Sequence, residues 1–155
     1  LPSLRFCLVK SNNVIIKNIP DFIIIESSTT NVLKHGTAAI SSSGTVNLEC
    51  ALAEIPTIVC YKTSYINWMI FKIFGKIDFI SIVNLIAEEK IIPELIQSDM
   101  TSKKILPPLL EYLSPSSKKR KETIEKYKKI RTKLGSPGVF DRAANHMISE
   151  KDNEK

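Results

Sequence analysis

Short apolar runs alternate with amphipathic segments along the first half of the chain. The runs at 4–9 and 21–26 are dense in apolar and β-branched side chains, so each predicts a buried strand. A short helix is expected at 30–35, and a third apolar run follows at 38–40. Strand, helix and strand in repetition predict an α/β domain with a doubly wound parallel sheet. So few residues separate the first two strands that only a minimal crossover helix fits between them.

The small and hydroxylated residues at 41–45 connect the third run to a helix predicted at 46–52, and a further strand is expected at 57–61. Backbone N–H groups at such a helix start can hold a phosphate, and Gly44 lets a ligand approach the backbone. A carboxylate one turn later, Glu49, could accept both hydroxyls of a ribose. An ordinary capped helix, with that carboxylate at its positive end, is the alternative. The candidate anion and ribose site comprises Ser43, Gly44, Thr45 and Glu49.

The segment 65–76 is apolar nearly all round and holds the single tryptophan of the chain. Lysines at its edges give it the composition of a helix that lies in a membrane interface. The alternative is a helix packed into the core or against another domain. The candidate membrane contacts are Trp68, Phe71, Phe74, Lys72 and Lys76.

Positive charge is concentrated at 118–133, where nine lysines and arginines accompany two glutamates, within a chain of net charge +6. Ile124, Tyr127, Ile130 and Leu134 recur at helical spacing, so a long cationic amphipathic helix is expected. This helix could present a solvated face over a core stripe, or it could attract anionic lipid. We expect no nucleic-acid partner, because aromatic interleaving and a recognisable binding motif are both lacking.

A last helix is expected after Ser136 and Pro137, and its apolar face needs a partner. The predicted organisation is a nucleotide-sugar-binding domain at 1–113, C-terminal helices at 114–150 and a polar tail at 151–155. Neither histidine has ligand spacing to cysteines or carboxylates, so we expect no metal and no cofactor. The chain shows no candidate signal peptide or membrane-spanning run. Its three cysteines are far apart and set in apolar runs, which predicts reduced core residues of a cytosolic protein.

Several short motifs occur together in the order and spacing of one known family. The chain resembles the C-terminal part of lipid A disaccharide synthase, a bacterial inverting glycosyltransferase, most densely between 38 and 97. The motifs are Ser43-Gly44-Thr45, Leu48-Glu49, Pro56-Thr57-Ile58-Val59, Tyr61-Lys62, Asn84-Leu85-Ile86-Ala87 and Pro93-Glu94-Leu95-Ile96-Gln97.

The resemblance implies a GT-B fold, in which two Rossmann-like domains face each other across a cleft, and this chain forms most of the donor-binding one. It also implies UDP-2,3-diacylglucosamine as donor, lipid X as acceptor and a β-1,6 linkage. Asn84 would join the UDP-sugar site, whereas the general base is expected outside this chain. The implied partners are an N-terminal domain or a second protomer, and the anionic inner-membrane surface on which the protein would be peripheral.

Two departures from the family pattern concern the loop around Asn84. The family commonly has Leu-Pro-Asn-Leu-Leu-Ala-Gly where this chain has Ile82-Val83-Asn84-Leu85-Ile86-Ala87-Glu88, so the proline and the glycine are replaced. Two other functions therefore stay open. One is a non-catalytic remnant or interaction module of the same fold, and the other is a different UDP-sugar enzyme.

Overall fold

The computed structural model describes residues 4–10, 13–64, 69 and 78–153. Within these ranges the strands form two separate parallel sheets, β1 with β2, and β3 with β4 and β5. In the register, Cys7 lies opposite Ile24, and Ile40 lies opposite Ile58. The strands are β1 (Phe6–Val9), β2 (Ile23–Glu26), β3 (Ala39–Ser41), β4 (Thr57–Tyr61) and β5 (Glu94–Ile96).

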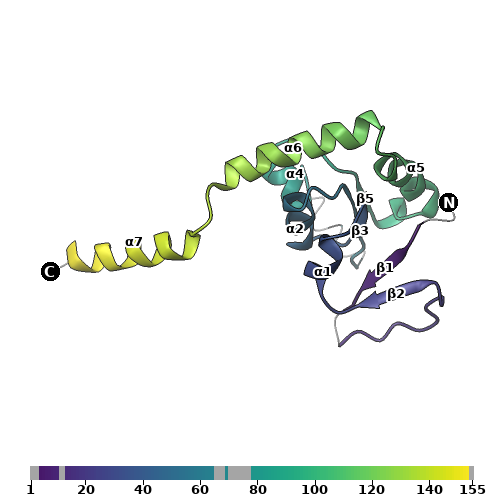
Figure 1. Cartoon of the computed structure of the whole chain (residues 1–155), viewed down its shortest axis with the longest axis horizontal. Coiled ribbons are helices and arrows are strands. Elements are labelled where there is room, and N and C mark those ends of the chain that lie inside the picture. The colour runs from purple at the N-terminus through teal and green to yellow at the C-terminus, as the bar shows by residue number, and fades with distance from the viewer. Residues whose placement is uncertain (1–3, 11–12, 65–68, 70–77, 154–155) are drawn as a thin grey trace.

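The helices connect the strands and cover the larger sheet. Figure 1 shows the long helix α6 crossing above α2 and α4, with α7 reaching away from the rest of the molecule. The helical elements are α1 (Thr29–Leu33), α2 (Val46–Leu52), α4 (Ile82–Ala87), the 3₁₀ turn η1 (Gln97–Asp99), α5 (Ser102–Leu113), α6 (Lys118–Leu134) and α7 (Val139–Asn153). The α/β architecture with parallel strands and C-terminal helices confirms the predicted fold class.

The hydrophobic core lies between the larger sheet and the helices α2, α4 and α6. Val59 of β4, Val83 of α4 and Ile130 of α6 belong to one fully buried cluster. β4 is the central strand of its sheet, and its first three residues are buried, as expected for a parallel strand covered on both faces. The core therefore fixes the strand ends from which the candidate site loops emerge.

The prediction that the first two strands are buried is wrong. β1 and β2 form where expected, but none of their residues is buried, and 48% of the Phe6 surface is exposed. The physical reason is that these two strands pair only with each other among the described residues, so one edge of each lacks a neighbour. The described part of their connection, residues 13–22, contains turns and bends and no helix.

The cationic helix is confirmed, with one correction to its buried stripe. Ser117 caps its start by accepting a hydrogen bond from the Arg120 amide, and the helix ends before Gly135. The side chains that reach the core are Thr123, Tyr127 and Ile130, whereas Leu134 is exposed because the helix extends past the body at that end. Tyr127 and Ile130 are thus buried as predicted, Ile124 is partly buried, and the buried stripe ends one turn earlier than expected.

The apolar face of α7, which the sequence predicts to need a partner, is exposed. Phe140 is 86% exposed, and Val139, Met147 and Ile148 are exposed as well. The predicted membrane segment 65–76, with its five candidate contacts, lies outside the described residues except at Met69. No helix in the described part of the chain is long and apolar enough to cross a membrane.

Candidate functional site

The candidate phosphate turn follows β3 at the carboxyl edge of the larger sheet. β3 ends at Ser41 and α2 begins at Val46, so the turn occupies the four residues between them. Gly44 has a φ of 151°, a conformation that L side chains rarely adopt. Because parallel strands end at the same edge, the loops after β3, β4 and β5 converge here.

The start of α2 presents backbone amides, and no side chain caps it. Thr45 is the N-cap residue, but its hydroxyl does not accept a capping hydrogen bond. The Asn47 amide bonds the Gly44 carbonyl at 3.2 Å, and the Leu48 amide bonds the Thr45 carbonyl at 2.9 Å. The amides of Thr45 and Val46 thus precede the helical ladder, where an anion can reach them.

Two further candidate residues, Glu49 and Ser43, differ in what surrounds them. Glu49 lies in the first turn of α2 with an exposed side chain, so its carboxylate can reach a ligand at the turn. Ser43 is partly buried, and its hydroxyl donates to the Ile80 carbonyl at 3.2 Å. That contact ties the turn after β3 to the segment that enters α4.

The sequence did not indicate Glu94 as a site residue, but its carboxylate connects the segment before α4 to β5. Its carboxylate accepts hydrogen bonds from the Ile80 amide at 3.0 Å and the Ser81 amide at 2.9 Å. The side-chain amide of Asn84 donates to the same carboxylate at 2.8 Å. Carboxylate hydrogen bonds of this kind are stronger than neutral ones, so Glu94 holds the start of α4 against β5.

Asn84 is fully buried, and its amide is saturated by protein groups. Besides the bond to Glu94, its Nδ2 donates to the Ile92 carbonyl at 3.1 Å. Its Oδ1 accepts from the amides of Ile91 at 2.8 Å and Ile92 at 3.0 Å. An asparagine side chain has two donors and two acceptor positions, so all four are in use. Asn84 therefore positions the chain that leads into β5, and a contact with UDP would require it to give up one of these bonds.

Two more contacts order the same edge of the sheet. Gln97 accepts a hydrogen bond from the Thr63 amide at 3.1 Å and donates to the Thr63 carbonyl at 3.0 Å. Asn47 is fully buried beneath the turn, and its Oδ1 accepts from the Ser41 hydroxyl. The sequence shows that hydroxyl and amide side chains occur in these segments. Which of them form hydrogen bonds with one another depends on the strand register, which the sequence does not show.

Glu88, which stands where the family commonly has glycine, adopts a backbone conformation that favours glycine. Glu88 ends α4 with a φ of 59°, in the left-handed region where glycine carries no steric penalty. This chain therefore keeps the helix-ending conformation with a residue that is less suited to it. The loop shape around Asn84 does not require the family's glycine.

Much of the charge on α6 is paired with the body of the domain. Lys126 forms an ion pair of 2.6 Å with Glu89, and Lys133 donates to the Ile86 carbonyl at 3.0 Å near the end of α4. The hydrogen bond from Lys126 is the main cause that lowers the pKa of Glu89. Arg120 donates to the Thr37 carbonyl at 2.6 Å. Lys118 and Lys128 pair with Glu122 and Glu125 of the same helix. Four further basic residues of α6 are exposed, namely Lys119, Lys121, Lys129 and Arg131.

A parallel α/β sheet, with helix-start amides and converging loops at its carboxyl edge, defines a Rossmann-like domain. Residues 9–144 match the model of the lipid-A-disaccharide synthetase family, and the chain belongs to that family.

Curated relatives agree with this assignment. The lipid-A-disaccharide synthase of Prochlorococcus marinus is 38% identical over 112 residues, which cover 71% of this chain and 28% of that protein. The enzyme of the same name from Gloeothece citriformis is 35% identical over 81% of this chain and 33% of its own length. That from Sulfurihydrogenibium sp. is 34% identical over 88% of this chain and 34% of its own length. The chain thus spans about a third of the relatives it matches.

Proposed function

We propose that this chain is the donor-binding part of a lipid A disaccharide synthase. It would bind UDP-2,3-diacylglucosamine, whose diacylglucosamine unit is transferred to lipid X with inversion and a β-1,6 linkage. The observation that carries the proposal is the family match, which includes the turn of residues 43–45 at the carboxyl edge of the parallel sheet. This edge is where open α/β sheets bind their ligands.

In this proposal the amides of Thr45 and Val46 bind the diphosphate, and Glu49 binds the ribose hydroxyls. As UDP departs, the turn stabilises the negative charge that develops on the leaving oxygen. Asn84 contributes by holding Glu94, which accepts from the Ile80 amide, and the carbonyl of the same residue positions Ser43. The acceptor hydroxyl is deprotonated by a group that this chain does not supply.

Calorimetric titration with UDP tests this assignment. We expect Gly44→Val to weaken binding at least about tenfold, because a β-branched residue is strained at a φ of 151° and the turn must change shape. Glu49→Ala should weaken binding by about 10- to 100-fold, since a hydrogen bond to a charged group contributes about 1.5–3 kcal/mol.

Glu54→Ala is the matched control, because it removes an exposed carboxylate just beyond the other end of α2. Its affinity for UDP should equal that of the unchanged chain. Equal affinities for all four proteins would show that the turn is not the UDP site.

We also propose that the protein is cytoplasmic and peripheral on the anionic inner membrane. The segment 65–76 would insert apolar side chains, and the outward-facing basic residues of α6 would attract phospholipid headgroups. Each basic residue near an anionic surface contributes about 1 kcal/mol, and apolar insertion adds to it. The exposure of Lys119, Lys121 and Lys129 supports the electrostatic half of this proposal.

Co-sedimentation with phosphatidylglycerol–phosphatidylcholine vesicles measures this binding. We expect binding at low salt, loss at high salt, and none to pure phosphatidylcholine, because charge attraction is screened within about 10 Å at 0.1 M salt. Alanine at Lys119, Lys121 and Lys129 together, or serine at Trp68 and Phe71, should each weaken it at least tenfold. If the protein does not bind the anionic vesicles, or if both variants bind as well as the unchanged chain, these segments do not contact the membrane and instead pack in the core or against another domain.

A non-catalytic module of the same fold is the second candidate. The largely exposed apolar face of α7 favours it, because such a face is typical of a surface that docks on another protein. A different UDP-sugar enzyme, the third possibility, would keep the UDP affinity but accept another donor sugar. UDP affinity together with transfer from UDP-2,3-diacylglucosamine, once a complementary domain is supplied, would reject both alternatives.

A further inference from the structure

Asn47 is a polar side chain that is fully buried in the first turn of α2. Its neighbours on the inner face of this helix, Cys50 and Ala51, are buried as well. The Nδ2 group of Asn47 has no hydrogen-bond partner among the described residues. A buried donor without a partner destabilises the folded state, so an apolar residue at this position would serve packing better. The presence of asparagine here therefore needs a reason other than packing.

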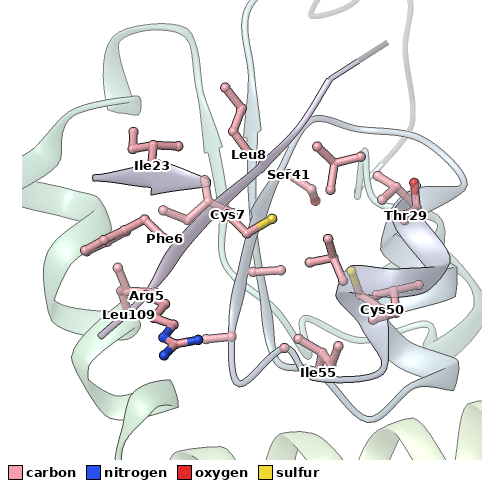
Figure 2. A pocket seen from close by; sticks show the side chains of 18 of the residues that line it. Arg5, Phe6, Cys7, Leu8, Ile23, Thr29, Ser41, Cys50, Ile55 and Leu109 are labelled. Carbon is pink, nitrogen blue, oxygen red and sulfur yellow. The ribbon is translucent and has the colours of Figure 1, made fainter. Parts of the chain in front are cut away.

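Two hydrogen bonds connect Asn47 to the candidate phosphate turn. Its Oδ1 accepts from the hydroxyl of Ser41, the last residue of β3. Its backbone amide bonds the Gly44 carbonyl at 3.2 Å. In Figure 2, Ser41 lies on the same side of β1 as Cys50, which follows Asn47 by about one turn of α2. One residue of α2 thus bonds the chain both before the turn and within it.

The turn is held at its start, in its middle and at its end. The bond between Ser41 and Asn47 holds the start. Ser43 donates to the Ile80 carbonyl at 3.2 Å, and this bond holds the middle. The carbonyl of Gly44 belongs to the first hydrogen bond of α2, which holds the end. The two amides proposed to bind the diphosphate are therefore pre-organised, and a pre-organised site loses less conformational entropy when its ligand binds.

We infer that Asn47 is a positioning residue of the donor site, which fixes the turn for a nucleoside diphosphate by holding the Ser41 hydroxyl. The inference rests on the proposed function, because it concerns the phosphate half of the same site. Asn47 is fully buried, so it acts through the turn and does not touch the ligand. Loss of its bond to Ser41 should therefore weaken binding of the diphosphate and leave binding of the nucleoside unchanged.

Two substitutions of nearly equal size at Ser41 isolate this bond. Ser41→Thr keeps the hydroxyl that donates to Asn47, whereas Ser41→Val has a methyl group in its place, and both side chains suit a strand. In calorimetric titrations we expect Ser41→Val to weaken UDP binding about three- to tenfold, which is the range that one hydrogen bond contributes. Ser41→Thr should bind UDP within about twofold of the unchanged chain. Uridine, which lacks the phosphates, should bind both variants equally.

Asn47→Ala completes a double-mutant cycle. It should weaken UDP binding by the same factor as Ser41→Val. In its background, Ser41→Thr and Ser41→Val should bind UDP equally, because the acceptor of the hydroxyl is gone. Thermal melting verifies that each variant is folded, and the two Ser41 variants alone decide the question if Asn47→Ala is not. Equal losses of affinity for UDP and uridine, or an effect of Ser41→Val that persists in Asn47→Ala, would show that the inference is wrong.

Gly44→Val and Glu49→Ala measure the proposed function separately. Glu49→Ala should weaken the binding of both UDP and uridine, because its carboxylate is proposed to bind the ribose. If these two changes weaken UDP binding and Ser41→Val does not, UDP occupies the turn but Asn47 does not position it. If none of the three changes alters the affinity for UDP, the turn is not the UDP site, and the inference fails together with the proposed function.

Discussion

Replacing Asn84 by alanine is expected to destabilise the protein by about 3–5 kcal/mol. The substitution leaves the buried amide of Ile92 without its acceptor, and it removes one of two acceptors from the Ile91 amide. It also removes a donor from the Ile92 carbonyl and from Glu94. Each buried group that loses its partner costs about 1–3 kcal/mol, and a domain of this size has only about 5–15 kcal/mol in total. Urea denaturation followed by circular dichroism measures the loss. Asn31→Ala, at an exposed position of α1, should change the stability by less than about 0.5 kcal/mol.

Asn84→Asp separates the two halves of this network. The new carboxylate can still accept from both isoleucine amides, but it faces Glu94 across a contact of 2.8 Å. Two like charges so close raise the pKa of the pair in the folded state above its unfolded value. A folded state that binds the extra proton is favoured at low pH, and this stability is lost as pH rises through the raised pKa.

The free energy of unfolding of Asn84→Asp should therefore be closer to that of the unchanged chain at pH 4–5 than at pH 7. A deficit that does not vary with pH would show that Glu94 is not the group that Asn84 holds. A loss below about 1 kcal/mol for Asn84→Ala would contradict the whole account of the network.

The elements that the sequence predicted best are those whose signal is local. The helix at α6 combines a cap at Ser117, a glycine stop and a helical apolar period, and all three lie within one segment. Likewise, a short apolar run predicted β4, and a run of small residues predicted the turn before α2. The α/β class follows from the order of such local signals.

The features that the sequence did not reveal depend on contacts between distant segments. The exposure of β1 depends on which strand lies beside it, and strand neighbours are not encoded in the run itself. The four bonds of Asn84 require β5 to pass beside α4, which no spacing rule predicts. The ligand contacts of the turn stay predictions, which the UDP titration tests.

The largest expected effect concerns catalysis by the 155-residue chain alone. Given UDP-2,3-diacylglucosamine and lipid X, we expect it to form disaccharide more than about 10⁴-fold more slowly than a full-length relative. General base catalysis contributes about 10²- to 10⁴-fold, and alignment of the two substrates contributes still more. In the proposed function, this chain supplies donor binding and leaving-group stabilisation from one sheet edge, and the base and the acceptor pocket come from outside it.

Product formation with radiolabelled lipid X measures this rate, with the Prochlorococcus marinus relative assayed in parallel as the positive control. Turnover within a few-fold of that relative would show that the chain contains its own base and acceptor site. Inactivity alone does not distinguish a donor-binding domain from a remnant, so UDP affinity must be measured on the same preparation. A chain that binds UDP through Gly44 and Glu49 but transfers nothing alone is a donor-binding domain if transfer appears once a complementary domain is supplied, because a non-catalytic remnant would stay inactive in that mixture.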